Sequence, residues 1–444
     1  MGKLFGTDGV RGVANSELTA DLAMRIGRAA GYILCKDRRQ RVLIGRDPRA
    51  SSEMLEAAIS AGLCASGVDV VRVGVIPTPG VAYLSRYLGA AAGVVITASH
   101  NPAHENGIKF FGPDGLKLPD AVEDQIEALV NTTDSLPAPV GSGVGRIYER
   151  SDLLHHYSQE VRHTIPHRLD GLRLVIDCAN GATSPVASDI LSDLGAEVVC
   201  INNHPDGLNI NANCGSLHPE GMMRAVTEHQ ADVGAAFDGD GDRVLMADEK
   251  GRLVDGDHIM GLCAIHWAGT YRLPGNTVVG TVMSNMGLEL TLKQVGIELL
   301  RTPVGDRYVS EEMRRVGAAL GGEKSGHICF AQHSTTGDGL ITLLQVLHVM
   351  HSTGKPLSEL ADQVLELPQI LVNVPVRTKD GWNSIPEIQS VISDAERALA
   401  GRGRLLVRPS GTESLIRVMA EGQDESEVKA LVNRIADVIR AHLA

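Results

Sequence analysis

RVLIGRD, at residues 41–47, is a short run of branched apolar residues that ends in a charged pair, and GVVITA, at residues 93–98, is a second such run. Runs of this length and composition are typical of buried strands. Between them, the spacing of apolar residues predicts a helix over 51–66, a strand over 68–73 and a helix over 78–88. Strands that alternate with helices in this way indicate an α/β architecture with parallel or mixed sheets.

The same order of elements recurs twice, and the tail of the chain then departs from it. The second copy has expected strands and helices at 172–178, 184–194, 197–201, 219–229 and 233–237. The third has them at 277–282, 286–295, 297–302, 306–316 and in a strand ending at Gly321. The tail reads as strands and helices at 370–376, 385–399, 404–408, 415–420 and 425–442. The fold class expected is therefore three repeated mixed α/β sheet domains and a smaller C-terminal α+β domain.

Domain boundaries are expected where the composition changes. Residues 131–145 (NTTDSLPAPVGSGVG) are rich in Ser, Pro and Gly, and Leu367-Pro368 ends the third copy. A chain of 444 residues is too long for one ordinary core. We therefore predict domains at residues 1–150, 151–254, 255–368 and 369–444.

Composition excludes several classes of partner. The net charge of −13 repels nucleic acid and anionic membranes, and an aromatic content of 3% leaves few stacking platforms for bases. No apolar run approaches the length of a membrane span, and the seven Cys include no C-x-x-C pair, which fits reduced thiols in the cytoplasm. Cys178 and Cys263 are expected to pack in cores. An acidic protein that binds phosphate must do so through local Arg, backbone N–H groups and a metal.

Asp238, Asp240 and Asp242 alternate with glycine directly after the third strand of the second copy. Alternate residues of an extended segment point the same way, so three carboxylates converge, which is unfavourable without a cation. Hard oxygen ligands of this kind suit Mg²⁺ or Ca²⁺. An EF-hand is excluded because no Glu stands at the required later position. A solvated acidic turn is the alternative.

Ser99 ends the third strand of the first copy and precedes His100-Asn101-Pro102. Ligands bind beyond the carboxyl ends of strands in such sheets, and a strand-end Ser presents its hydroxyl there. The surrounding residues are not G-x-S-x-G, so a hydrolase elbow is not indicated. A turn or helix-capping Ser is the alternative. A serine bearing phosphate would supply an anionic oxygen to a metal on the neighbouring module.

Other candidates suit a sugar phosphate. Arg408-Pro-Ser410-Gly411-Thr412 is interpreted as a phosphate cradle, helped by Arg417, with a hairpin turn as the alternative. Glu323, Ser325 and His327 alternate after the third copy and offer hydrogen bonds to hydroxyls, although a polar loop is the simpler explanation. The remaining candidates are Arg11, which stands among three glycines and could point at an anion, and Lys109, which serves as an acid, a base or a charge for phosphate.

Four loops together resemble the α-D-phosphohexomutase superfamily. They are Thr97–Pro102 (TASHNP), Asp238–Arg243 (DGDGDR), Gly322–His327 (GEKSGH) and Arg408–Glu413 (RPSGTE), similar in order to its phosphoserine, metal, sugar and phosphate loops. FGTDGVRG at 5–12, GLNINA at 207–212 and GDRYV at 305–309 are similar to the branch that isomerises glucosamine phosphates.

The resemblance implies four domains around a central cleft and a mutase, that is, an isomerase of amino sugar metabolism. It implies that phosphorylated Ser99 converts glucosamine 6-phosphate to glucosamine 1-phosphate through a 1,6-bisphosphate, which feeds UDP-N-acetylglucosamine and cell-wall synthesis. It also implies one Mg²⁺ per chain on Ser99, Asp238, Asp240 and Asp242, a catalytic role for Arg243, and a homodimer. The acid and base stay open among Lys109, His100 and His327.

Two departures and three rival functions accompany this resemblance. Lys324 replaces a residue that is often uncharged in that branch, which leaves the choice of sugar open, and Ser414 replaces a usual Pro. The rivals are a phosphoglucomutase or phosphomannomutase, a non-catalytic sugar-phosphate sensor, and a phosphatase.

Overall fold

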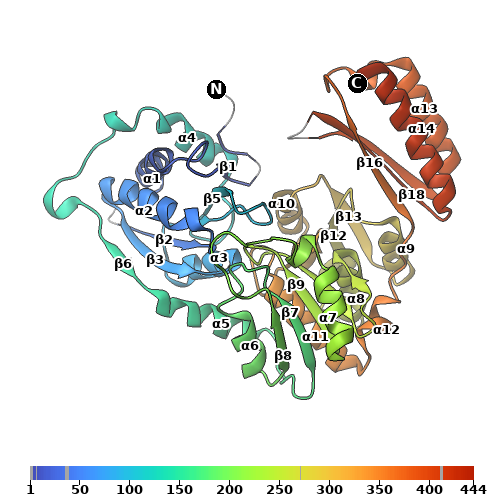
Figure 1. Cartoon of the computed structure of the whole chain (residues 1–444), viewed down its shortest axis with the longest axis horizontal. Coiled ribbons are helices and arrows are strands. Elements are labelled where there is room, and N and C mark those ends of the chain that lie inside the picture. The colour runs from blue at the N-terminus through green and yellow to red at the C-terminus, as the bar shows by residue number, and fades with distance from the viewer. Residues whose placement is uncertain (1–3, 7, 36–39, 271, 411–413) are drawn as a thin grey trace. The chain divides into compact units, whose positions relative to one another are not determined.

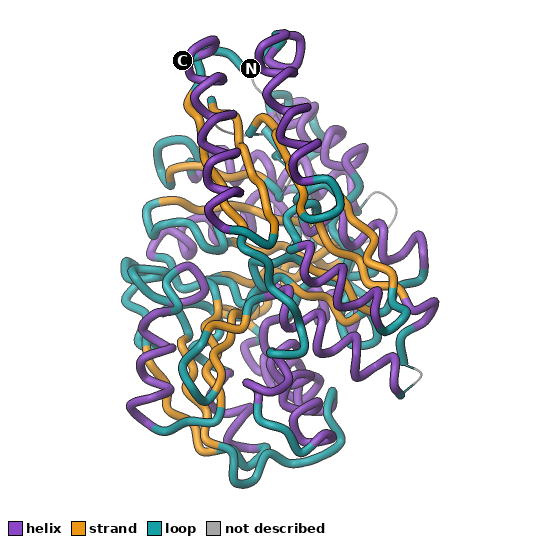
Figure 2. Tube along the Cα trace, turned by 90° about the vertical axis from the view of Figure 1, so that its right-hand side faces the viewer, coloured by secondary structure: helices purple, strands orange, loops and turns teal. Residues whose placement is uncertain are grey.

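The computed structural model describes residues 4–6, 8–35, 40–270, 272–410 and 414–444, which form two compact units (Figure 1). The first unit comprises Met1–Met283 and Leu299–Asp362, and the second comprises Ser284–Glu298 and Gln363–Ala444. Strands run side by side in sheets and helices pack against them (Figure 2).

The first sheet of the first unit has the order β1-β5-β4-β2-β3-β6. Strands β2, β3, β4 and β6 pair in parallel, whereas β5 is antiparallel to both β4 and β1. Helices α1 and α2 pack on each other, and their apolar residues form one core with the sheet. The elements are β1 (Val10–Val13), α1 (Ala20–Leu34), β2 (Arg41–Arg46), α2 (Ala50–Ala65), β3 (Asp69–Val75), α3 (Thr78–Tyr87), β4 (Ala92–Ile96), β5 (Glu105–Phe111), α4 (Asp120–Val130) and β6 (Ile147–Glu149).

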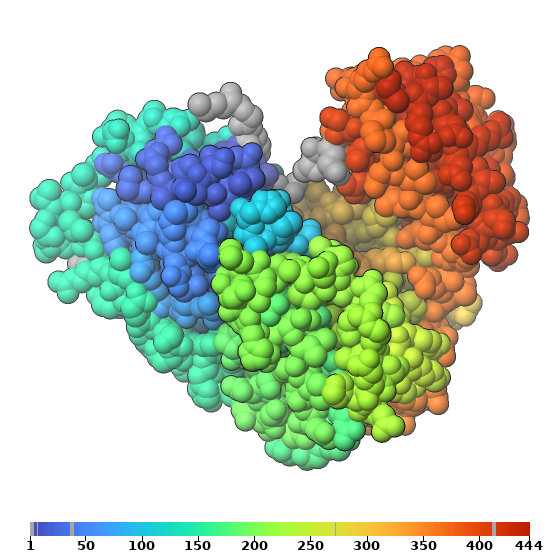
Figure 3. Space-filling view, viewed as in Figure 1, coloured from blue at the N-terminus to red at the C-terminus, as the bar shows by residue number. Residues whose placement is uncertain are grey.

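The second sheet has the order β11-β10-β9-β7-β8, with β7 parallel to β8 and β9 and with β10 antiparallel to β9 and β11. Its elements are α5 (Leu154–His163), β7 (Arg173–Asp177), α6 (Ala187–Asp193), β8 (Glu197–Ile201), α7 (Glu220–His229), β9 (Val233–Phe237), β10 (Val244–Asp248) and β11 (Leu253–Val254). Figure 3 shows its surface, in green, continuous with the blue and cyan surface of the preceding residues of the first unit.

The third sheet has the order β13-β12-β14-β15, with β12 parallel to β14 and β14 antiparallel to β15. Its elements in the first unit are α8 (Gly256–Gly269), β12 (Thr277–Thr281), β13 (Glu298–Thr302), α10 (Asp306–Val316), β14 (Leu320–Gly322), β15 (Ile328–Phe330), α11 (Gly339–Thr353) and α12 (Leu357–Ala361). Helix α9 (Met286–Gln294) belongs to the second unit.

One strand order is repeated in the three sheets. The orders β4-β2-β3, β9-β7-β8 and β14-β12-β13 are equivalent, and an antiparallel strand lies beside the first member of each. The three repeated mixed sheets predicted from the sequence are therefore confirmed. Because β4, β9 and β14 occupy the same place in each sheet, the loops that follow them leave equivalent strand ends.

Helices α8 and α11 were not among the predicted elements. Eleven of the fifteen residues of α11 are buried, on all sides of the helix, so its sequence has no polar face and shows no amphipathic period. Helix α8 is likewise buried over most of its surface. Asp255 and Asp338 cap these helices, since their carboxylates accept the first backbone N–H groups of α8 and α11.

The second unit is the predicted α+β domain together with α9. Its antiparallel sheet has the order β16-β18-β17, and helices α13 and α14 share one apolar core with it. The elements are β16 (Gln369–Pro375), α13 (Pro386–Leu399), β17 (Gly403–Pro409), β18 (Leu415–Gly422) and α14 (Glu425–Leu443). In the described part of the chain no helix is both long and apolar enough to cross a membrane, and the seven cysteines are free, with Cys178 and Cys263 buried as predicted.

Four histidines gather where the segment after α5 meets α8 and α11. The ring of His167 stacks on His351, and its Nε2 lies 2.9 Å from Nδ1 of His348, with His266 nearby. Nδ1 of His167 donates to the carbonyl of Arg168, so its Nε2 accepts from His348. Burial, together with the neighbouring His167, His266, Arg272 and His351, lowers the pKa of His348 to about 4.

We expect His348 to make the fold less stable in acid. The unfolded chain takes a proton on this His near pH 6.5, whereas the folded chain takes it only near pH 4. Its contribution is complete above pH 6.5 and is lost as the pH falls toward 4. His348→Gln should therefore flatten the decline of the urea midpoint between pH 7.5 and pH 5. His163→Gln, which removes an exposed His of α5, should keep the wild-type slope, and an unchanged slope in His348→Gln would contradict the assignment.

Candidate active site

Ser99 follows β4 on a tight turn. Its φ of 53° lies in the left-handed region, and its N–H donates to Oγ1 of Thr97 over 2.9 Å. The hydroxyl donates to Oδ2 of Asp238 over 2.6 Å, which joins the first loop to the second. The predicted convergence of these two loops is thus present in the fold, and strain in the turn aims the hydroxyl at the aspartates.

Arg49 donates hydrogen bonds to the segment that carries Ser99, and the sequence did not indicate it as a site residue. It is fully buried, its Nε donates to Oδ2 of Asp47 over 2.8 Å, and its other nitrogens donate to carbonyls of the loop. Those carbonyls belong to Ser99, Asn101, Pro102 and Glu105. Its guanidinium therefore satisfies carbonyls of this segment, two of which, those of Ser99 and Asn101, also accept hydrogen bonds from Nδ2 of Asn211. No local signal marks Arg49, because its carbonyl partners lie about fifty residues away.

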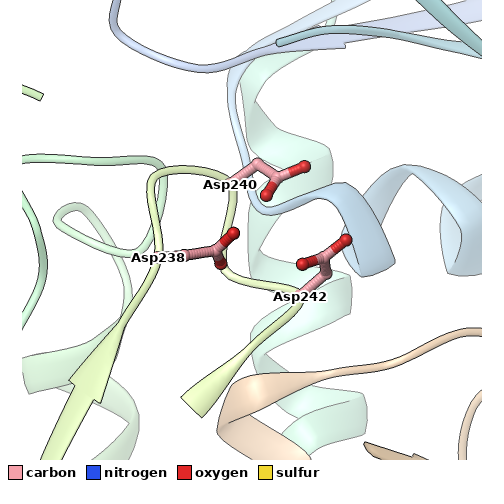
Figure 4. Close-up of side chains that lie close together, drawn as sticks. All are labelled: Asp238, Asp240 and Asp242. Atoms are coloured by element: carbon pink, nitrogen blue, oxygen red, sulfur yellow. The ribbon is translucent and has the colours of Figure 1, made fainter. Parts of the chain in front are cut away.

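The three aspartates lie on the loop after β9 with their carboxylates turned toward a common space (Figure 4). One oxygen from each lies within 4.8 Å of the others, and all three residues are buried. Oδ1 of Asp240 and Oδ1 of Asp242 have no hydrogen-bond partner among the residues that the structure describes. Burial and the two neighbouring carboxylates raise the pKa of Asp238 well above its usual range. Orphaned buried oxygens and mutual repulsion are what a bound divalent cation would relieve, so the donor set fits one.

Lys109 supplies a buried positive charge to this cluster. Its side chain is 3% exposed, and Nζ lies 3.0 Å from Oδ2 of Asp8 and 3.0 Å from Oδ2 of Asp240. Burial lowers its pKa, but Asp240, Asp8 and Asp242 outweigh burial and raise it. Lys109 therefore stays protonated and is suited to neutralising phosphate rather than to accepting a proton.

His100 and His327, the other two candidates for proton transfer, differ in charge. Burial lowers the pKa of His100 to about 4, helped by Arg243 and Arg11, so the ring is neutral at pH 7. Its Nδ1 lies 3.5 Å from Oγ of Ser99. Burial lowers the pKa of His327, but the neighbouring Asp242 and Asp306 outweigh it and raise that pKa.

The sugar-loop candidates also reach the metal loop. Nδ1 of His327 lies 3.6 Å from Oδ2 of Asp242, and the backbones of Arg243 and His327 form an isolated β-bridge. Oε2 of Glu323 accepts from Ser325 over 3.3 Å. Burial lowers the pKa of Arg243, but Asp242 and Asp238 outweigh it and raise that pKa, so this guanidinium stays charged.

A closed ring of charges surrounds the site, and half of it was not predicted. It is made by Asp8, Lys109, Asp242, His327, Asp306 and Lys117 in that order. Arg11 pairs with Asp8 from outside the ring. No local sequence pattern marks Asp8, Lys117 or Asp306 as a site residue, and they are brought together only by the packing of the first and third sheets.

Lys324, the departure noted in the sugar loop, lies near Asp255 rather than near the other candidates. Its Nζ is 3.4 Å from Oδ2 of the Asp255 carboxylate, which caps α8. The Lys324 ammonium group is therefore paired with a carboxylate of the same predicted domain, residues 255–368.

The phosphate-loop candidates belong to the second unit. Arg408 of β17 and Arg417 of β18 are opposite each other in the antiparallel pair, and burial together with Arg417 lowers the pKa of Arg408. Lys379, which the sequence did not single out, donates to the carbonyl of Ser410 over 2.7 Å. Two adjacent guanidinium groups repel each other, and a bound anion would relieve that repulsion. Gly411 and Thr412 lie outside the described residues.

Comparison with known domain families covers nearly the whole chain. Residues 2–137, 154–251 and 255–367 match the phosphoglucomutase/phosphomannomutase alpha/beta/alpha domains I, II and III, and residues 371–438 match the C-terminal domain of that family. The chain belongs to the phosphoglucomutase/phosphomannomutase family. The resemblance drawn from the four loops is thereby confirmed, and the chain is an enzyme, an isomerase that moves a phosphoryl group.

Relatives within this family bear a more specific name. The phosphoglucosamine mutase of Desulforamulus reducens is 55% identical over 441 residues, covering 99% of both chains. That of Geobacillus kaustophilus is 52% identical over 446 residues, covering 100% of this chain and 99% of the relative. The enzyme thus groups with the bacterial phosphoglucosamine mutases, as its amino-terminal and GDRYV stretches indicated.

Solved structures show the same fold. A phosphoglucomutase/phosphomannomutase family protein from Burkholderia thailandensis aligns with a TM-score of 0.82 and 26% identity, covering 99% of this chain and 97% of that one. The N-acetylphosphoglucosamine mutase of Aspergillus fumigatus, solved with GlcNAc-6P and magnesium, aligns with a TM-score of 0.69 and 20% identity, covering 99% and 95%.

Proposed function

We propose that the enzyme interconverts glucosamine 6-phosphate and glucosamine 1-phosphate by way of a phosphoryl group carried on Ser99. The observation that carries the proposal is the buried Ser99 hydroxyl 2.6 Å from Asp238 in a chain 55% identical to a phosphoglucosamine mutase. In the forward direction a sugar hydroxyl oxygen forms a bond to phosphorus while the bond from Oγ of Ser99 breaks, which gives the 1,6-bisphosphate. Ser99 then recovers the other phosphoryl group.

The chain's own residues divide the work of that transfer. Lys109 and Arg243 are fixed cations beside the transferred charge, and positioning together with electrostatic stabilisation is what phosphoryl transfer chiefly requires. His100, neutral and near Ser99, is placed to accept the proton of the attacking hydroxyl. Glu323, Ser325 and His327 would bind sugar hydroxyls, and Arg11 would contact an anion. A phosphate would be held in the second unit by Arg408, Ser410, Gly411, Thr412 and Arg417.

We assign one Mg²⁺ to Asp238, Asp240 and Asp242, with Ser99 or its phosphate as a further ligand. The orphaned oxygens of Asp240 and Asp242 support this assignment, as does magnesium in the Aspergillus mutase. Such an ion polarises a phosphoryl oxygen and offsets its charge.

Asp240→Asn should weaken metal binding, since it removes one charge from the cluster and leaves Lys109 without one of its acceptors. We expect roughly 10–100-fold more Mg²⁺ for half-maximal rate. Calorimetric titration of Mg²⁺ and the Mg²⁺ dependence of the rate measure this. Asp193→Asn, the same change at an exposed position on α6, should behave as wild type, and an Asp240→Asn enzyme with unchanged Mg²⁺ affinity would refute the ligand assignment.

The substrate is tested by comparing the isomerisation of glucosamine, glucose and mannose 6-phosphates under one set of conditions. We expect the highest kcat/KM for glucosamine 6-phosphate. A preference for mannose 6-phosphate would overturn the proposal, release of free phosphate without isomer would indicate a phosphatase, and absence of phosphate from Ser99 would indicate a sensor.

The remaining assignments accompany this function. We propose a cytoplasmic enzyme that supplies glucosamine 1-phosphate toward UDP-N-acetylglucosamine and the cell wall, acts as a homodimer, and is divided at residues 150, 254 and 368. Light scattering of the purified chain tests the dimer, and limited proteolysis tests the boundaries.

A further inference from the structure

Asp306 stands beside the candidate sugar loop without belonging to it. It is the first residue of α10, and the N–H of the preceding Gly305 donates to Oε1 of Glu323 over 3.0 Å. Its own Oδ2 lies 3.8 Å from Nε2 of His327. Two of the three residues assigned to sugar hydroxyls are therefore its immediate neighbours. A group bound by Glu323 and His327 is within reach of the Asp306 carboxylate.

The carboxylate is also open to a ligand. Its side chain is 18% exposed, more than those of Asp240, Asp242 or His327. Burial raises its pKa, but Lys117 outweighs burial and lowers it, so Asp306 is an anion.

Charge pairing distinguishes Asp306 from the other carboxylates of the ring. Asp8 is paired with Arg11, Lys109 and Lys117, so three cations offset its single negative charge. Asp306 has Lys117, at 2.6 Å, which it shares with Asp8, and the more distant His327. Because Asp242, the third anion of the ring, is assigned to the metal, Asp306 is the carboxylate of the ring that is left to accept an ammonium group.

We propose that Asp306 binds the ammonium group at C2 of the amino sugar and so selects it over hexose phosphates. The inference rests on the proposed function and names the residue that determines its specificity. Glucosamine 6-phosphate differs from glucose 6-phosphate in having an ammonium in place of a hydroxyl. An ammonium group adds charge attraction to its hydrogen bond with the Asp306 carboxylate, whereas a hydroxyl offers the hydrogen bond alone, and we expect this difference to give roughly tenfold discrimination.

Glu323 is less suited to this role, although it lies close by. One of its oxygens accepts the Gly305 N–H and the other accepts the Ser325 hydroxyl. Both oxygens of Glu323 are thus engaged by neutral donors, whereas Asp306 accepts the Arg307 N–H over 2.7 Å on one oxygen and faces the Lys117 ammonium with the other. Removal of the Glu323 charge should affect glucosamine and glucose phosphates alike.

The test is the ratio of kcat/KM for glucosamine 6-phosphate to that for glucose 6-phosphate. Asp306→Asn should lower this ratio about tenfold, mainly through KM for the amino sugar, while activity on glucose 6-phosphate persists and shows that the variant is folded. Lys117→Met removes the competing cation and should raise the ratio. Glu323→Gln should lower both activities and keep the ratio.

Asp120→Asn is the matched control. Asp120 pairs with Arg307, so this variant breaks another ion pair between the same two segments without changing the charge ring, and it should keep the wild-type ratio. An unchanged ratio in Asp306→Asn, or an unchanged or lowered ratio in Lys117→Met, would overturn the inference. A kcat/KM ratio that falls in Glu323→Gln but not in Asp306→Asn would also overturn it. If wild type itself does not prefer the amino sugar, the proposed function fails instead, which separates the two failures.

Discussion

Ser99→Ala should reduce mutase activity at least about 10⁴-fold, because it removes the atom that carries the phosphoryl group in both half-reactions. The fold should be little affected. The Ser99 hydroxyl donates to Asp238 and lies 3.5 Å from Nδ1 of His100, whereas the turn is held by backbone groups that alanine keeps. Coupled assay of glucosamine 1-phosphate formation measures the loss, and urea unfolding checks the fold.

Intact mass provides an independent readout for the same variant. Purified wild type should carry an added phosphate of about 80 Da that peptide mapping places on Ser99, and the variant should lack it. Ser135→Ala, at an exposed turn after α4, should retain both the phosphate and the activity. Full activity in Ser99→Ala would refute phosphoryl transfer through this residue.

Arg49→Met should destabilise the first unit by about 3–5 kcal/mol, the cost of removing one partner of a buried ion pair. Arg49 and Asp47 are both fully buried, so Asp47 would be left without its charge partner. Four carbonyls around Ser99 would also lose a donor. We therefore expect a lower urea midpoint together with a lower kcat, because the hydroxyl of Ser99 is no longer aimed at Asp238.

The matched control for Arg49→Met is Arg150→Met. Arg150 also pairs with an aspartate two residues away, Asp152, but both side chains are largely exposed. Exposed pairs contribute little, so the midpoint and the rate should stay at their wild-type values. Equal effects of the two substitutions would contradict the role assigned to Arg49 in holding the loop.

Part of the candidate site could be predicted from short stretches of the sequence. Aspartates that alternate with glycine, and a Ser at the end of an apolar strand, are patterns within a few residues, and the threefold repeat of strands and helices is also local. Such features depend on backbone period and on residue type, which the sequence states directly. The helices that escaped prediction, α8 and α11, lack the polar face on which that reasoning depends.

The sequence alone predicted the repeated α/β modules, which the structure confirms, and the strand-end loops whose residues we propose to carry phosphate and metal. Only the tertiary structure decided which side chains from distant loops meet: Arg49 beneath Ser99, and Asp8, Lys117 and Asp306 in one ring. It also decided charge states, with Lys109 held protonated and His100 neutral. The physical reason is that burial and Coulomb interactions depend on distances in space, which separation along the chain does not reveal.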